Sequence, residues 1–161
     1  MRTRLATPAD AEAISALIRG VSRFFTLRPD GAGAEAFMET ISPEAIRGYL
    51  SSPEYVYRVA EDDGALAGVV AIRDNRHLYH LFVAPDGHRR GLARRLWTEA
   101  MDTALRAGNP GEFTVNSSPY AVPVYERFGF VAMGPRTEAN GIAFIPMRLA
   151  LQPPDAAPSP G

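Results

Sequence analysis

The chain has 161 residues, a length typical of one compact domain. Hydrophobic residues make up 46% and charged residues 22%, ordinary values for a soluble globular protein. The absence of cysteine excludes disulfides, thiolate metal sites and a cysteine nucleophile. A formal net charge of -1 gives no support to binding of nucleic acid or of a membrane surface.

All 17 basic residues are arginine, which excludes a lysine Schiff base and a phosphate-binding lysine. No apolar run approaches the roughly 20 residues that a membrane-spanning helix needs. The N-terminal residues turn polar before the apolar core of a signal peptide could form. We therefore expect a cytoplasmic protein.

The first fifty residues predict one strand and two helices. Residues 2–6 alternate enough for a short strand. Thr7-Pro8-Ala9-Asp10 has the residues of a helix cap, and apolar positions at helical spacing follow it as far as Val21. After a loop at 28–33, Ser42-Pro43-Glu44 starts a second, shorter helix.

The middle of the chain changes to the pattern of strands. Three runs rich in strand-forming residues are separated by polar turn signals, at 55–60, 66–72 and 77–83. Three successive antiparallel strands are the simplest interpretation.

The remaining elements alternate between helices and strands. We predict helices at 92–105 and 120–128, and strands at 113–116, 130–133 and 142–151. Residues 152–161 are too rich in proline and too polar to bury anything, so we expect a single domain over 1–151 and a disordered tail.

One segment, Leu81 to Leu96, contains the residues that indicate a ligand-binding site. It reads as a buried strand, a loop and the start of a helix, whose first N–H groups are unpaired and lie at the positive end of the helix dipole. Gly91 has no side chain to obstruct a ligand, and Arg89 and Arg90 add positive charge. Such a loop can hold a pyrophosphate without a metal.

This segment resembles the acyl-CoA-binding motif of the GNAT superfamily of N-acetyltransferases. Leu81-Phe82-Val83 matches its apolar triplet, and Gly91 and Ala93 match its small positions, whereas His88 stands where the family usually has Gln or Arg. The resemblance implies that acetyl-CoA is bound as co-substrate, without a metal. The implied binding residues are Leu81, Phe82, Val83, His88, Arg89, Arg90, Gly91, Leu92, Ala93, Arg94 and Asn116. We expect the side chains of Arg94 and Arg95 to lie on a solvent-exposed face of the helix.

A later stretch is similar to a second motif of the same family. Asn116 ends a predicted strand, and the next helix carries Tyr125 before the pair Gly129-Phe130. The resemblance implies an α/β (α+β) fold with a mixed, mostly antiparallel central sheet flanked by helices. It also implies a splayed acyl-CoA cleft between the central strands.

The implied reaction is direct transfer of an acetyl group to an amine, with Tyr125 protonating the departing thiolate. The general base is His77, which stands where family members often carry Glu, or else His80 or a water. In a regular strand His77 and His80 point to opposite faces, unless a bulge intervenes, so they are not read as a metal pair.

The sequence indicates least about the acceptor of the acetyl group. The resemblance places Phe24 and Phe25, together with His80, at the acceptor pocket, although packing is the default role of both phenylalanines. Glu35 and Glu39 are the candidates for an acidic trap of a cationic amine. A small amine, a peptide or a protein lysine, an O-acetyl acceptor and a homodimer all stay open. The alternative function is a non-catalytic acyl-CoA-binding or sensing domain.

Overall fold

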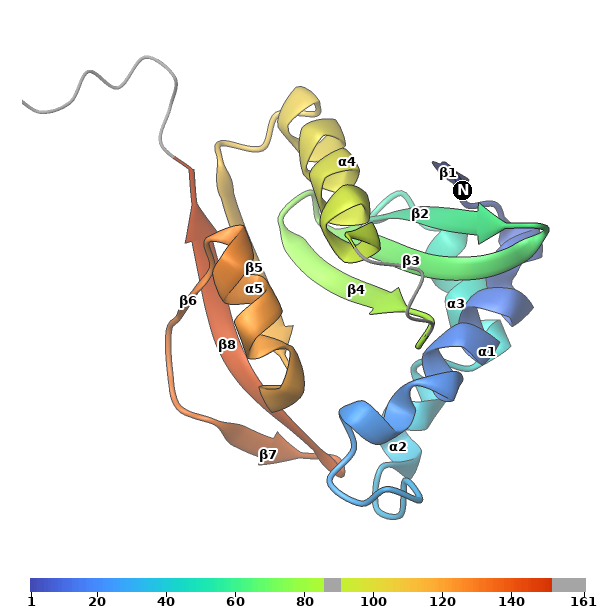
Figure 1. The fold of residues 1–161 in the computed structure, drawn as a ribbon, viewed down its shortest axis with the longest axis vertical. Coiled ribbons are helices and arrows are strands. Elements are labelled where there is room, and N and C mark those ends of the chain that lie inside the picture. Colours follow the sequence, from blue (N-terminus) through green and yellow to red (C-terminus); the bar gives the residue numbers. More distant parts are fainter. Residues whose placement is uncertain (86–90, 152–161) are drawn as a thin grey trace, which may run out of the picture.

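The structure is a computed structural model that describes residues 1–85 and 91–151 (Figure 1). Short 3-10 turns at Pro8–Asp10, Ser22–Phe24 and Pro119–Ala121 precede or follow the longer elements. The helices are α1 (Ala11–Gly20), α2 (Glu35–Glu39), α3 (Pro43–Leu50), α4 (Leu92–Arg106) and α5 (Val122–Phe128). The strands are β1 (Arg2–Leu5), β2 (Tyr55–Asp62), β3 (Ala65–Arg73), β4 (His77–Val83), β5 (Glu112–Ser117), β6 (Val131–Ala132), β7 (Thr137–Ala139) and β8 (Ile142–Ala150).

The strands form one mixed sheet in the order β1-β2-β3-β4-β5-β8-β6, and β7 pairs with β8. The β4–β5 pair is parallel, and the other pairs in the described part of the chain are antiparallel. This is the mostly antiparallel sheet that the sequence predicted.

Helices cover both faces of the sheet, because its strands bury side chains on both sides. On one face α4 and α5 pack on a core that includes Leu96, Phe113 and Met147, and in Figure 1 these helices lie in front of the sheet. On the other face α1 and α3 pack on a second core around Ile14, Ile46 and Val69.

The two central strands diverge soon after they meet. β4 and β5 are paired only at His77 with Thr114 and at Leu78 with Val115. Beyond Leu78 the strands separate, as Figure 1 shows. The splay that the resemblance implied is therefore present, and it opens the sheet between β4 and β5.

A bulge interrupts β4 just beyond this point. On β3, Ala71 faces His80 and the next residue, Ile72, faces Leu78, so Tyr79 has no partner of its own. Tyr79 and His80 consequently both turn toward the face that α1 and α3 cover. The expectation for a regular strand is wrong here: His77 and His80 face the same side.

The sequence located these elements to within a few residues. The predicted helix at 120–128 is divided into a 3-10 turn and α5, since Pro119 and Pro123 each remove a backbone donor. The strand at 130–133 is only two residues long, and β7 escaped prediction because it is short and polar. The predicted tail at 152–161 lies outside the described residues.

Candidate active site

The main cavity is a cleft of about 500 Å³ that opens where β4 and β5 separate. β4 contributes every residue from His77 to Val83, and β5 contributes Val115 and Asn116. Residues of the segment after α1, of α4, of α5 and of β8 complete the walls. The splay therefore places a ligand-sized space in the middle of the sheet.

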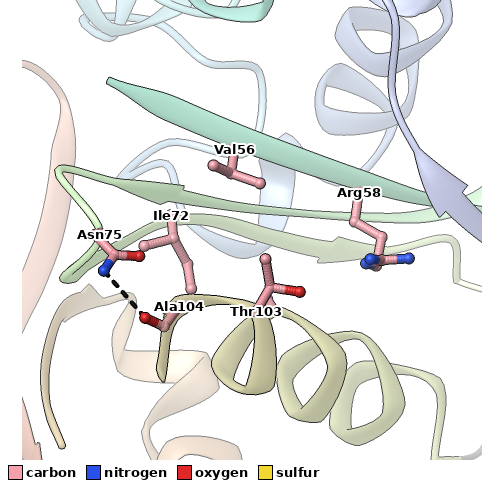
Figure 2. A pocket seen from close by; sticks show the side chains of 7 residues that line it. Val56, Arg58, Ile72, Asn75, Thr103 and Ala104 are labelled. Atoms are coloured by element: carbon pink, nitrogen blue, oxygen red, sulfur yellow. Dashed lines mark hydrogen bonds between the residues drawn. The ribbon is translucent and has the colours of Figure 1, made fainter. Parts of the chain in front are cut away.

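A second hollow lies between α4 and the β2–β3 hairpin (Figure 2). Its volume of about 20 Å³ has room for about one water molecule. Beside it the Asn75 amide donates a hydrogen bond to the Ala104 carbonyl at 3.0 Å, which ties the strand turn to the helix. This hollow is a packing gap rather than a site for a ligand.

The edge of β4 presents unpaired backbone groups to the cleft. The Ala84 N–H donates to the Ala67 carbonyl at 2.8 Å, so Phe82 and His80 are the residues of β4 that exchange hydrogen bonds with β3. The N–H and C=O groups of Leu81 and Val83 therefore point away from β3, toward the space that β5 has left. An extended ligand can pair with them as a strand does.

The start of α4 supplies a second set of free donors. Gly91 caps the helix with φ of +78°, a conformation that favours glycine, and its α-carbon faces open space. The N–H groups of the first helical turn, at Leu92, Ala93 and Arg94, have no intrahelical partner. Ala93 also lines the cleft. His88, Arg89 and Arg90, predicted to bind the same group, lie outside the described residues.

The side chains in that first turn differ in what they can do. Leu92 is buried in the core under α4. The Arg94 guanidinium lies 5.1 Å from the ring centroid of Phe128 and donates to the Arg127 carbonyl at 3.3 Å. The Arg94 side chain therefore contacts α5, while its backbone N–H belongs to the free donors of the first helical turn.

Tyr125 reaches the cleft from α5. Its ring packs at 5.7 Å from that of Phe130, and only 6% of the residue is exposed. Burial raises the pKa of the Tyr125 phenol, which keeps it protonated. Within the described residues its hydroxyl has no hydrogen-bond partner. A buried, protonated phenol on a residue that lines a cleft is equipped to donate a proton to a ligand there.

Both predicted histidines line the cleft and both are held neutral. Burial, assisted by the charge of Arg73, lowers the pKa of His77 to about 4. Burial alone lowers the pKa of His80 to about 3. The Nδ1 atom of His77 lies 2.8 Å from the Thr114 hydroxyl, and that of His80 lies 3.0 Å from the Tyr57 hydroxyl. Among the described residues, neither Nε2 atom has a hydrogen-bond partner.

Aromatic side chains close one end of the cleft. Phe24 stacks on Tyr120 with ring centroids 4.9 Å apart, which joins the segment after α1 to the start of α5. Nearby, Thr26 forms an isolated bridge with Ile142 of β8, and Figure 1 shows these two segments meeting. Phe25 packs between Phe37 and Phe82. This end is therefore walled by apolar rings.

The cleft brings together most of the residues singled out in the sequence. The predicted residues that line it are Phe24, Phe25, His77, His80, Leu81, Phe82, Val83, Ala93, Asn116 and Tyr125. Asn116 is exposed at the end of β5. The two candidates for an acidic trap, Glu35 and Glu39, do not line the cleft.

Sequence reasoning missed several residues of the cleft wall: Phe37, Arg73, Tyr79, Tyr120 and Phe144. For Arg73 a signal was present. The predicted turn at 74–76 makes residues 73 and 77 neighbours across two strands, and the structure pairs Arg73 with His77.

The sequence matches the model of the acetyltransferase (GNAT) domain over residues 25–151. The chain belongs to the GNAT acetyltransferase family. The matched range contains β4, the bulge, the start of α4 and Tyr125. Family membership supports acetyl transfer, with an acyl-CoA as donor, as the general chemistry of this cleft.

Solved GNAT structures share the fold at low sequence identity. A GCN5-related N-acetyltransferase from Rhodopseudomonas palustris superposes with a TM-score of 0.73 at 21% identity, covering 93% of this chain and 95% of that one. The PaiA N-acetyltransferase from Thermoplasma acidophilum, in complex with coenzyme A, gives 0.72 at 18% identity over 94% and 100%. The aminoglycoside 6'-N-acetyltransferase from Enterococcus faecium gives 0.69 at 16% identity over 96% and 100%.

A search among curated protein sequences found no match. In the described part of the chain, no helix is both long and apolar enough to cross a membrane. Nor do residues 1–85 and 91–151 contain a group of three or more His, Asp or Glu side chains placed to hold a metal ion.

Proposed function

We propose that residues 1–151 form an N-acetyltransferase that moves an acetyl group from acetyl-CoA directly to an amine. One observation carries this proposal: the free edge of β4 and the buried Tyr125, whose hydroxyl has no partner among the described residues, line the same cleft. The first can hold a thioester-bearing arm, and the second can protonate a thiolate. The acceptor bound next to them is then acetylated.

The described residues fit coenzyme A at two places. The backbone groups of Leu81 and Val83 would pair with the two amides of the pantetheine arm. The N–H groups from Gly91 to Arg94 would bind the pyrophosphate, since they are free and lie at a positive helix end. Asn116, exposed beside the cleft, would contact the same co-substrate. When bound, acetyl-CoA supplies an already activated acyl group.

Two side chains would handle the protons. The amine nitrogen attacks the thioester carbonyl, so that a C–N bond forms and the C–S bond breaks. A backbone N–H of β4 would stabilise the charge that develops on the carbonyl oxygen. His77, neutral in its buried position, or a water that it orients, would accept the proton from the amine. Tyr125 would give its proton to the departing thiolate.

The substitution Tyr125→Phe tests this assignment. We expect amine-dependent release of the CoA thiol to fall by about 100-fold, within the range that general acid catalysis supplies. Because the hydroxyl has no partner in the described residues, its loss should leave the melting temperature unchanged. The matched control is Tyr55→Phe, which removes a phenol that does not line the cleft.

The same assay on the variant and on the wild-type protein distinguishes a wrong residue assignment from a wrong function. An unchanged rate in Tyr125→Phe would overturn the role of this phenol. A wild-type protein that binds acetyl-CoA but releases no thiol with any amine would instead be the non-catalytic acyl-CoA-binding domain. Calorimetric titration with acetyl-CoA supplies the binding measurement in that comparison.

A further inference from the structure

The charge of the cleft wall is unusual for an enzyme that binds amines. Among the described residues that line the cleft, none is an aspartate or a glutamate, and Arg73 is the only one with a formal charge. A polyamine or an aminoglycoside brings several positive charges, which such a wall leaves unpaired and desolvated. The lining therefore disfavours a polycationic acceptor.

Arg73 stands close to the proposed base. It pairs with His77 across β3 and β4, so their side chains leave the sheet on the same face. Its guanidinium carbon lies 5.4 Å from the ring centroid of Tyr79, and its ion pair with Asp74, at 3.7 Å, is exposed and weak. The guanidinium thus remains available to an anionic group in the cleft.

Aromatic side chains line the part of the cleft around Arg73 and His77. Next to Arg73 and His77, on the face that α1 and α3 cover, the wall consists of Phe25, Phe37, Tyr79, His80 and Phe82. We call these residues, with Arg73 and His77, the acceptor half. The opposite half, with Leu81, Val83 and Tyr125, belongs to the other core. An aromatic body fits the first half through ring contacts and apolar burial.

We propose that the acceptor is an aromatic amine with a neighbouring carboxylate, of the class of aromatic α-amino acids. The carboxylate binds the Arg73 guanidinium, the ring packs in the acceptor half, and the amine lies beside His77. This inference rests on the proposed function, because it names the substrate class of that reaction.

The residues of the acceptor half also favour the uncharged form of the amine, which is the form that attacks the thioester. None of the described residues that line this half carries a carboxylate. Asp74, which does not line the cleft, is ion-paired with Arg73 at 3.7 Å, and the Arg73 charge opposes that of an ammonium ion. Both imidazoles are neutral because burial lowers their pKa. The wall therefore favours the uncharged, nucleophilic amine, whereas an acidic trap would stabilise the unreactive ammonium.

Matched acceptors and variants test the proposal. Thiol release from acetyl-CoA is measured with phenylalanine, with phenethylamine, which lacks only the carboxylate, and with spermidine. We expect kcat/KM for phenylalanine to exceed that for phenethylamine at least tenfold, and spermidine to be the poorest. Arg73→Met should abolish the preference for phenylalanine over phenethylamine. Arg106→Met, which removes an exposed arginine at the end of α4, should behave as wild type.

Binding in the presence of coenzyme A gives a second readout that needs no turnover. Phenylalanine should raise the melting temperature of the complex more than spermidine does. Spermidine acetylated as well as phenylalanine, or equal losses for both aromatic amines in Arg73→Met, would overturn the acceptor class alone. Thiol release with none of these three amines would overturn the acceptor class, whereas wild-type protein that binds acetyl-CoA and releases no thiol with any amine would overturn the proposed function.

Discussion

At the scale of single residues, His77 and His80 differ most from what their sequence context suggests. A strand histidine with an ordinary pKa near 6.5 changes charge around neutral pH. Here burial lowers the pKa of His77 to about 4 and that of His80 to about 3. Burial depends on how the α1–α3 layer packs against β4, so it could not be inferred from local sequence. The positions of both residues within the strand could be inferred from the sequence.

These shifts predict an acid-sensitive fold. Because the unfolded chain binds protons at these imidazoles and the folded chain does not, stability is full above pH 6.5 and is lost as the pH falls toward 4. The fully buried His80 should contribute about 1 kcal/mol of this loss between pH 6.5 and 5.5, and the less buried His77 should contribute less. Urea unfolding at several pH values measures it.

The variant His80→Gln isolates one of the two contributions. Its free energy of unfolding should approach that of wild type by about 1 kcal/mol between pH 6.5 and 5.5. Parallel pH curves for the two proteins would show that the buried imidazole does not titrate as described. Both proteins are compared at each pH, so groups that they share cancel.

At the scale of elements, β4 and the start of α4 form the proposed binding surface, and the sequence predicted the positions of both elements. The limits of β4 were correct to the residue because polar turn signals bracket an apolar run. The bulge was not predictable, since one extra residue leaves no trace in composition. It depends on the register with β3, which is a tertiary property.

The register of β4 predicts an alternating pattern of amide hydrogen exchange. In the free protein the amides of Leu81 and Val83 should exchange quickly, because they face the cleft, while those of His80 and Phe82 should be protected by β3. Saturating coenzyme A should slow exchange at Leu81 and Val83. Amide exchange followed by NMR measures all four. Protection of Leu81 and Val83 without ligand would contradict the free edge.

Substitutions of Gly91 test whether the N-terminus of α4 binds the phosphates of acetyl-CoA. Gly91→Ala meets no side chain but places a methyl group at φ +78°, so we expect a stability loss of about 1 kcal/mol and little change in affinity for acetyl-CoA. Gly91→Glu carries the same strain and adds bulk and negative charge. Its affinity should fall at least tenfold below that of the alanine variant in calorimetry. Equal affinities would place the pyrophosphate elsewhere.

At the scale of the whole molecule, element order and family motifs fixed the fold in advance, but the cleft wall was only partly foreseen. Among the backbone features, the splay was implied by the family resemblance, and the start of α4 follows from the placement of Gly91. The wall depends on which side chains from distant segments meet, as Phe24 and Tyr120 do. For the same reason the sequence could not show that Glu35 and Glu39, the candidates for an acidic trap, do not line the cleft.

The unpaired Tyr79 also determines where β4 tolerates a change in length. Removing one residue elsewhere between the bulge and Val83 would invert every side chain on one side of the deletion. Removing Tyr79 itself would restore regular pairing, with Leu78 still opposite Ile72 and His80 still opposite Ala71. Deletions that preserve the pairing of this strand should therefore accumulate at this position during divergence, at the cost of one aromatic ring in the acceptor half.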